Sequence, residues 1–425
     1  MGDSFFVNSF MNDRLSHLKL PFPQAWLPAD ACLVGGTVRD ALLNRQRDPF
    51  DFDLILEDQA VELAREIANR CQAGFVVLDA ERDMARIVFA EGTVDFARIE
   101  GESLEQDLHR RDFTINAIAH HLQSQTLIDP LQGKQDLEAR VIKMVSPQNL
   151  RDDPLRLLRA YRQAGQLTFT IDESTRESIR EIAPCLQAVA AERIQTELSY
   201  LLATSQGSFY LQQAWEDGVL SPWFPNLTQE SVEKVQQIDT AKEILSQQFP
   251  SLPPTWDNNV GGESDSLQAL AKLACFVSSS PEEAEAQLMA LKYSRAEIRT
   301  VTNTLNLLPR LLEENIAEMT LRDQYFFFQD AGKVFPVVLL TAIAKGLSLE
   351  SVQPLIERYL NSNDPVAYPQ PLVTGKDLLR SLDLSPSPQI GELLTELQIA
   401  VIEGKIKTPR EAIALAQSWL EQECG

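Results

Sequence analysis

Two aspartates in one short apolar segment are the first residues whose type and spacing could do chemistry. Asp51 and Asp53 stand two apart in FDFDLIL, so on a β-strand both carboxylates project from one face while Phe52 and Leu54 enter the core. Two carboxylates on one face repel each other unless a cation lies between them. A solvated strand end would show the same pattern, so this pair alone leaves both interpretations open.

A third acid favours the metal interpretation. Asp95 lies in another apolar segment, between Val94 and Phe96, which should both be buried. Three carboxylates from two neighbouring strands can hold two Mg²⁺ ions, which would activate a 3′ hydroxyl and steady a triphosphate during in-line transfer. This interpretation requires Asp95 to lie beside Asp51 and Asp53.

A pair of glycines separates a strand-like segment from a helix-like one. Gly35 and Gly36 follow ACLV and precede TVRDALLN, so they remove side chains where the backbone turns. A phosphate could approach the amides at the beginning of that helix. A plain tight turn would also explain two glycines.

The elements that must position these residues change character near residue 150. Before it, strand-length apolar segments alternate with helical patterns, which predicts a small sheet with flanking helices. After it, apolar residues recur three and four apart, which predicts a helical array. Residues 251–266 mix Pro, Gly, Asn and Ser and predict a loop or a boundary. The expected strands are 31–34, 52–56, 74–79, 85–90 and 93–99, and the expected helix between them is 59–71.

Composition limits the partners. The 425 residues carry a formal net charge of -23, which argues against coating nucleic acid through a basic surface, so any RNA contact should be local and arginine-rich. The N-terminus lacks the pattern of a signal peptide, and no membrane span is expected. Five scattered cysteines without CxxC spacing predict free thiols. We therefore expect a cytoplasmic protein with no membrane association and no obligate protein partner.

Five ordered motifs and a tail segment carry a family resemblance. The chain closely resembles the class II tRNA nucleotidyltransferases and bacterial poly(A) polymerases. The motifs are LVGGTVRDALLNRQRDPFDFDLIL, DLHRRDFTINAIA (107–119), IDPLQGKQDLEARVI (128–142), RDDPLRLLRAYRQAGQL (151–167) and AERIQTELSYLL (191–202), and the tail segment is 373–416. Residues 205–370 contain no recognisable pattern.

The resemblance implies an α+β fold, in which a small N-terminal nucleotidyltransferase-type mixed sheet with flanking helices precedes an all-α neck, body and tail. The implied catalytic head is 1–145, the neck with the base-reading motif is 146–205, and the RNA-binding body and tail are 206–425. The implied activity is template-independent addition of CMP, and possibly AMP, from CTP and ATP to the 3′ end of tRNA, with Mg²⁺ as the cofactor.

The resemblance also implies roles for individual residues around the carboxylates. Asp51 and Asp53 match the metal-binding pair. The triphosphate would be gripped by Gly35, Gly36 and Arg39. Arg111 would contact the nucleotide, and Asp112 and Asn116 would support the sugar side of the site.

A helix beginning near residue 153 should read the base. Asp152-Asp153-Pro154 has the form of a helix start, and Asp153, Arg156, Arg159 and Arg162 follow at intervals of three, as they also would on a salt-bridged exposed face. By resemblance, Asp153 and Arg156 form hydrogen bonds to the edge of cytosine or adenine, and Arg159 and Arg162 make further nucleotide contacts. Asp152 stands where the family usually has Glu.

The product is open within the family, whose members add CCA, CC, A or poly(A). Full CCA-adding members commonly carry a flexible loop between the DxD strand and the RRD motif, and residues 59–92 look compact instead, which favours CC addition. Other classes to exclude are a catalytically inactive RNA-binding scaffold and a nucleotide sensor. A C-terminal HD phosphohydrolase domain is excluded because all four histidines lie within the first 121 residues. RNA contacts of the tail are expected from Lys292, Arg295, Arg299, Lys376, Lys405 and Lys407.

Overall fold

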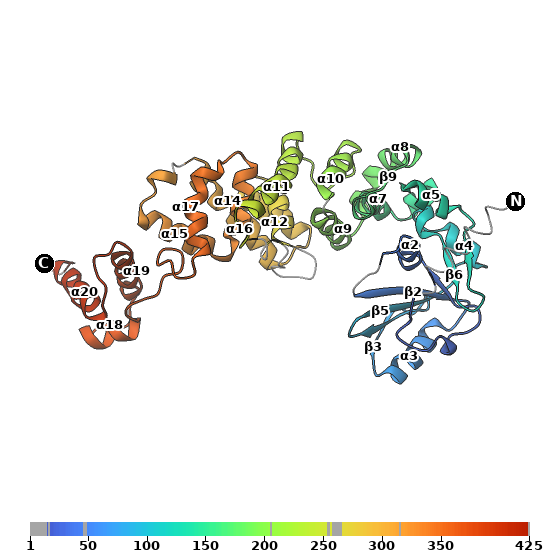
Figure 1. Cartoon of the computed structure of the whole chain (residues 1–425), viewed down its shortest axis with the longest axis horizontal. Coiled ribbons are helices and arrows are strands. Elements are labelled where there is room, and N and C mark those ends of the chain that lie inside the picture. Colours follow the sequence, from blue (N-terminus) through green and yellow to red (C-terminus); the bar gives the residue numbers. More distant parts are fainter. Residues whose placement is uncertain are drawn as a thin grey trace. The chain divides into compact units, whose positions relative to one another are not determined.

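The computed structural model describes residues 15, 18–45, 49–204, 206–252, 256, 266–313 and 316–423 (Figure 1). The chain divides into two compact units. Unit 1 comprises residues 1–190 and 213–223, and unit 2 comprises residues 191–212 and 224–425. The three-domain division expected from the sequence stays a prediction, and most of the expected loop 251–266 lies outside the described residues.

A seven-stranded mixed sheet forms the beginning of unit 1. Its spatial order is β3-β4-β5-β2-β1-β6-β7, and β2 and β5 are parallel while the other described neighbours are antiparallel. The strands are β1 (Cys32–Val34), β2 (Phe50–Leu56), β3 (Gly74–Asp79), β4 (Met84–Phe89), β5 (Gly92–Arg98), β6 (Ala119–His121) and β7 (Thr126–Ile128).

The alternation of β2 and β5 follows from their sequences. Phe52 and Leu54 of β2 and Val94 and Phe96 of β5 are buried, while the aspartates between them are partly exposed on the opposite face. Helix α3 (Ala60–Cys71) packs on β3, β4 and β5 through its apolar face, and α2 (Gly36–Leu42) packs on β1 and β2. The sheet therefore leaves one polar strip, which contains Asp51 and Asp53.

Short helices continue unit 1 beyond the sheet. They are α4 (Leu104–His109), η2 (Thr114–Asn116), α5 (Gly133–Ala139), α6 (Pro147–Asp152), α7 (Leu155–Leu167), α8 (Glu173–Ile182) and η3 (Ala183–Ala188). A two-stranded parallel ribbon, β8 (Val141–Ile142) with β9 (Thr170–Ile171), flanks α6 and α7 in the sequence. The expected base-reading helix is α7, which begins directly after Pro154.

A buried carboxylate fastens α7 and α8 to the segment that returns to unit 1. Asp217, with a side chain 2% exposed, accepts hydrogen bonds from the Tyr161 hydroxyl at 2.6 Å and from Arg176 Nε at 2.8 Å. Arg180 Nε donates to its other oxygen at 2.7 Å. Burial by itself raises the pKa of Asp217, but the hydrogen bonds from Arg176, Tyr161 and Arg180 hold the pKa below its usual value.

Unit 2 is helical throughout its described part. Its helices are α9 (Ala191–Ala203), the beginning of α10 (Gly207–Glu216), α11 (Gln229–Gln248), α12 (Leu267–Phe276), α13 (Pro281–Ala290), α14 (Arg295–Leu312), α15 (Leu321–Ala331), α16 (Phe335–Ala344), α17 (Leu349–Leu360), α18 (Gly375–Leu382), α19 (Pro388–Ile402) and α20 (Pro409–Glu423). Ser294 begins α14 with a capping box, and Thr320 and Thr374 do the same for α15 and α18. Helices α18–α20 share a hydrophobic core of their own.

One stretch of unit 2, Leu321–Ala344, is long and apolar enough to cross a membrane by length and composition. It comprises α15, α16 and the short turn between them, and 61% of its most apolar window is buried inside the protein. Burial among the other helices accounts for this hydropathy. The predicted fold class, a mixed N-terminal sheet followed by a helical body, is confirmed.

Candidate active site

The two aspartates of β2 lie side by side on the partly exposed face of the sheet. The Thr93 hydroxyl of β5 donates to Asp51 Oδ1 at 2.7 Å. The Thr37 hydroxyl of α2 donates to the main-chain oxygen of Asp51 at 2.9 Å and accepts from the amide of Asp53 at 3.3 Å. These two threonines fix the beginning of β2 against β5 and α2.

Asp95 occupies the expected place but has a partner of its own. In the parallel register of β2 and β5, Asp95 lies directly opposite Asp53. Arg86 of β4 donates from Nε to Asp95 Oδ1 at 2.6 Å and from Nη2 to Oδ2 at 2.8 Å. The bond to Asp95 raises the pKa of Arg86, burial lowers it, and the charges of Asp95, Asp51 and Asp53 raise it further. Arg86 therefore faces all three carboxylates.

The pair Asp51 and Asp53 is better suited to bind a divalent metal than the set of three acids that includes Asp95. Mg²⁺ is commonly bound by one or two carboxylates, with water and substrate phosphates completing its shell. Within the described part of the chain, no group of three or more His, Cys, Asp or Glu side chains is arranged to hold an ion. The residues present fit a metal held by the β2 pair together with substrate oxygens.

The glycine turn lies between this pair and Arg111. Gly35 has a φ of +68°, which favours glycine, and precedes the first turn of α2. A Cβ atom at this position would be 3.1 Å from Arg111 Nη1 and 3.3 Å from Asp53 Oδ2. The absent side chain keeps open a space that has a guanidinium on one side and a carboxylate on the other.

Arg111 is aimed by a buried acid of α4. Asp107 Oδ2 accepts from Arg111 Nη2 at 3.0 Å and from Nε at 3.3 Å, and the Asp107 side chain is only 6% exposed. Arg110 pairs with Glu100 and is nearly half exposed. Of the two adjacent arginines, Arg111 therefore faces the turn.

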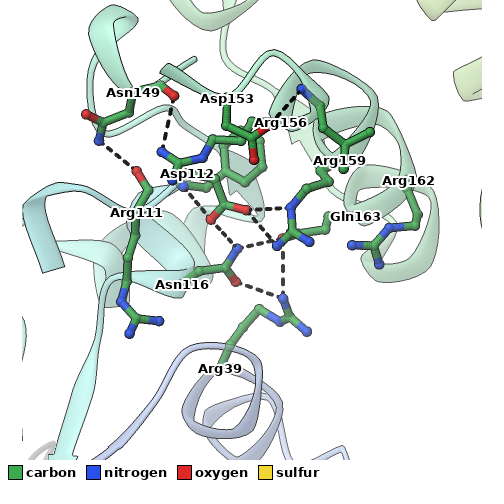
Figure 2. A network of polar contacts seen from close by, with 12 residues as sticks. Arg39, Arg111, Asp112, Asn116, Asn149, Asp153, Arg156, Arg159, Arg162 and Gln163 are labelled. Atoms are coloured by element: carbon green, nitrogen blue, oxygen red, sulfur yellow. Dashed lines mark hydrogen bonds and ion pairs between the residues drawn. The ribbon is translucent and has the colours of Figure 1, made fainter. Parts of the chain in front are cut away.

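Asp112 and Asn116 belong to a buried network of polar side chains (Figure 2). Asp112 Oδ2 accepts from Arg159 Nη2 at 2.9 Å and from Nε at 3.0 Å, while Oδ1 accepts from Asn116 Nδ2 at 2.9 Å. Burial by itself raises the pKa of Asp112, but the Arg159 guanidinium and the hydrogen bonds from Asn116 and the Phe113 amide hold the pKa well below its usual value. Asp112 is thus a fixed negative charge beneath α7.

Arg39 is buried in the same network. Its side chain is 6% exposed, Nε donates to Asp40 Oδ1 at 2.9 Å, and Nη1 donates to Asn116 Oδ1 at 2.8 Å. The resemblance implied a direct grip on the triphosphate. This geometry instead favours an indirect role, in which Arg39 holds α2 and its glycine turn in place.

The beginning of α7 carries the expected base-reading residues. Asp153 Oδ1 accepts from the amide of Leu155 at 3.3 Å, which supports the predicted helix start. Arg156 Nη1 donates to the main-chain oxygens of Arg110 at 2.7 Å and Asn149 at 3.2 Å, so its guanidinium has a fixed direction (Figure 2). Asn149 Nδ2 in turn donates to the main-chain oxygens of His109 and Arg111.

An open cavity of about 580 Å³ lies beside Arg156. It is lined by Ser103, Glu105, Gln106, His109, Arg110, Asn149, Asp152 and Arg156. The lining holds both charged donors and charged acceptors, the combination that recognition of a polar ligand requires. Arg162 is bound instead to Gln166, with Nη1 donating to Oε1 at 2.8 Å.

Unit 1 thus brings most of the predicted residues into two adjoining groups. Gly35, Asp53 and Arg111 meet at the turn, and Asp112, Asn116 and Arg159 meet under α7. The sequence did not point to the residues that orient them, namely Thr37, Arg86, Asp107, Asn149 and Gln163. The alternation of MARIVF places Arg86 on the face of the acids, which was a usable signal.

A glycine turn, a paired-carboxylate strand and a polar helix on a mixed sheet define a nucleotidyltransferase. Three family models match successive parts of the chain, described as poly A polymerase head domain over residues 31–143, probable RNA and SrmB-binding site of polymerase A over 168–230, and tRNA nucleotidyltransferase domain 2 over 263–416.

Relatives match nearly end to end. The CC-adding tRNA nucleotidyltransferase of Synechocystis sp. is 49% identical over 95% of this chain and 98% of its own. The A-adding tRNA nucleotidyltransferase of Deinococcus radiodurans is 31% identical over 94% and 97%. The chain belongs to the family of tRNA nucleotidyltransferases and bacterial poly(A) polymerases that its motifs resemble.

Solved structures share the fold. A CCA-adding enzyme in complex with CTP has a TM-score of 0.72, and the Thermotoga maritima CCA-adding enzyme complexed with tRNA has a TM-score of 0.68. Each is 23% identical and covers 92% of this chain and 91% of its own. The predicted enzyme class, a tRNA nucleotidyltransferase of the CCA- or CC-adding type, is confirmed, and this family generally uses a divalent metal.

Proposed function

We propose that this enzyme adds two CMP residues from CTP to the 3′ end of tRNA and stops before the terminal AMP. The observation that carries this proposal is the 49% identity to a CC-adding enzyme over 95% of the chain. The stretch between Asp53 and Arg110 supports it, because α3, β3, β4 and β5 fill that stretch and only residues 80–83 connect β3 with β4.

Asp51 and Asp53 hold Mg²⁺ in this proposal. The metal supplies activation of the 3′ hydroxyl and neutralises charge on the triphosphate. The open space at Gly35 accepts phosphate oxygens next to the Arg111 guanidinium, which Asp107 keeps aligned. Asp95 remains paired with Arg86, and the positive charge of Arg86 acts on Asp51 and Asp53.

Base selection falls to the beginning of α7. Asp153 accepts and Arg156 donates at the edge of the incoming base, doing with protein what a template strand would do. The bonds from Arg156 to the main-chain oxygens of Arg110 and Asn149 hold its remaining donors in one direction. Cytosine offers an amino donor next to the acceptor N3, which suits this pair, whereas uracil and guanine carry a ring N–H in that place.

Unit 2 binds the acceptor arm of tRNA in this proposal, chiefly through the RNA backbone. All six cations expected from the sequence are exposed. Lys292 precedes α14, and Arg295 and Arg299 lie in its first two turns. Lys376, Lys405 and Lys407 lie in the region of α18–α20. The free thiols of the described cysteines are consistent with work in the cytoplasm.

Incorporation should be measured on three transcripts, which end before CCA, after C, and after CC, with CTP or ATP supplied separately. We expect two CMP additions to the first, one to the second and none to the third, and no AMP on any. AMP on the CC-ending transcript would make this a CCA-adding or A-adding enzyme, and long A tails would make it a poly(A) polymerase. The variant with both Asp51→Asn and Asp53→Asn is the inactive control.

A further inference from the structure

Gln163 points from α7 into the polar network of Figure 2 although nothing in the sequence singled it out. Gln163 is only 2% exposed. Gln163 Oε1 accepts from Asn116 Nδ2 at 2.9 Å and from Arg39 Nη1 at 3.3 Å. One neutral oxygen therefore receives hydrogen bonds from two different elements of unit 1.

The partners of Gln163 lead to both halves of the site. Arg39 lies on α2, which begins at the glycine turn beside Asp53. Asn116 also donates to Asp112, the acid that Arg159 binds. Because Arg159 and Gln163 are one turn apart on α7, this helix is attached to α2 through one side chain and to Asp112 through the other.

An apolar side chain of the same size could fill this position but could not replace the bonds. The Arg39 guanidinium and the Asn116 amide would each lose a buried acceptor, and an unsatisfied buried donor is costly. A small shift of α7 relative to α2 would let them find other partners. Such a shift changes the distance between the turn and the beginning of α7, and misplacement by an ångström costs catalysis.

We propose that Gln163 is a positioning residue that sets the spacing between the phosphate-binding turn and the base-reading end of α7, and thereby helps to select the base. This inference rests on the proposed function. A cytosine and an adenine differ in how far their edges reach from a triphosphate held at Gly35. The spacing set by Gln163 decides which edge meets Asp153 and Arg156.

The experiment compares Gln163→Met, which keeps the length but loses the acceptor, with Gln163→Glu, which keeps an acceptor for both donors. Steady-state kcat and KM are measured for CTP on a tRNA ending before CCA, and the preference for CTP over ATP is measured as the inhibition constant of ATP against CTP divided by the KM for CTP. We expect Gln163→Met to lower kcat for CTP about tenfold and to reduce the preference for CTP over ATP about tenfold. Gln163→Glu should recover most of both, and the exposed Gln187→Leu should match wild type.

Equal kcat and equal preference in wild type and Gln163→Met would overturn the inference while leaving the proposed function intact. Failure of the glutamate variant to recover any activity would also overturn it, because the acceptor would then not be what matters. If Gln163→Met does not fold, Gln163→Asn retracts the oxygen by one carbon and should lose the preference. Wild-type selectivity in that variant overturns the inference, and a wild type that adds no CMP overturns the proposed function with it.

Discussion

Arg86 of β4 binds both carboxylate oxygens of Asp95 on β5, and Asp95 lies directly opposite Asp53 on β2. The arginine contributes a positive charge within a group of three acids that would otherwise repel one another. It also occupies the oxygens that a third metal ligand would need. The acidic group therefore consists of a β2 pair that faces the glycine turn and an ion pair that borders it.

The first prediction concerns the β2 pair. Asp51→Asn or Asp53→Asn should each lower CMP incorporation by about a thousandfold, because a metal contact contributes several kcal/mol to the transition state. Thermal unfolding should show no loss of stability, since each change removes a repelling charge. Asp58→Asn, at an exposed position after the same strand, is the matched control. Activity near wild type in either variant would refute the metal assignment.

The second prediction concerns the effect of Arg86 on Mg²⁺ binding. Arg86→Ala should lower the Mg²⁺ concentration for half-saturation about five- to tenfold, because one opposing charge a few ångströms from the acids contributes about 1 kcal/mol. Calorimetric titration of the protein without nucleotide measures this directly. Arg82→Ala, an exposed arginine in the preceding turn, should change nothing.

The same titration tests whether Asp95 is a ligand. Asp95→Asn should weaken Mg²⁺ binding much less than Asp53→Asn does. Equal losses in the two variants would show that Asp95 leaves Arg86 and joins the metal, as the sequence alone predicted.

The third prediction follows from the lowered pKa of Asp112. Asp112→Asn should reduce the free energy of unfolding by about 2–3 kcal/mol at pH 7, because it leaves Arg159 without its buried partner. A carboxyl group with a lowered native pKa stabilises above its unfolded pKa of about 4 and loses that effect as the pH falls toward the native pKa.

Urea unfolding of wild type and Asp112→Asn at several pH values measures this dependence. The difference between the two proteins should be constant from about pH 7 to pH 5 and should shrink below about pH 4. A difference that instead grew on acidification would show that Asp112 is protonated in the folded protein.

The fourth prediction concerns the cluster around Asp217. Tyr161→Phe removes a buried hydrogen bond to a charged group and should lower stability by about 1.5–2 kcal/mol. Asp217→Asn should cost more, about 3 kcal/mol, since Arg176 and Arg180 lose their shared counter-charge. Tyr325→Phe in unit 2 is the control. Unchanged thermal unfolding in Tyr161→Phe would contradict the assigned role.

Sequence periodicity predicted the parts of the site that depend on one element at a time. The alternation around Asp53 and Asp95 gave the correct face of each strand, and the Asp153-Pro154 pattern gave the beginning of α7. The ion pair of Arg86 with Asp95 was not predicted, because alternation indicates the face of a side chain but not its partner on a neighbouring strand. The five expected strands, apart from small shifts at their ends, are β1 to β5, whereas β6 and β7 were not among them.

The burial of Gln163 and of Arg39 was not predicted, for a different physical reason. A glutamine within a helical pattern is usually solvated, and an arginine near a glycine turn suggests a phosphate contact. Both are buried here because each satisfies the other and Asn116. Such tertiary satisfaction of polar groups depends on several distant segments at once, so the local sequence carries no sign of it.

Asp217 also determines when, during synthesis, unit 1 can finish folding. Residues 213–223 belong to unit 1 although residues 191–212 between them and α8 belong to unit 2. A nascent chain that has emerged only as far as residue 190 has Tyr161, Arg176 and Arg180 in place but not the carboxylate that joins them. The catalytic unit therefore completes its folding only after the ribosome has begun the helical unit. A shortened chain made to produce unit 1 alone should consequently extend through residue 223.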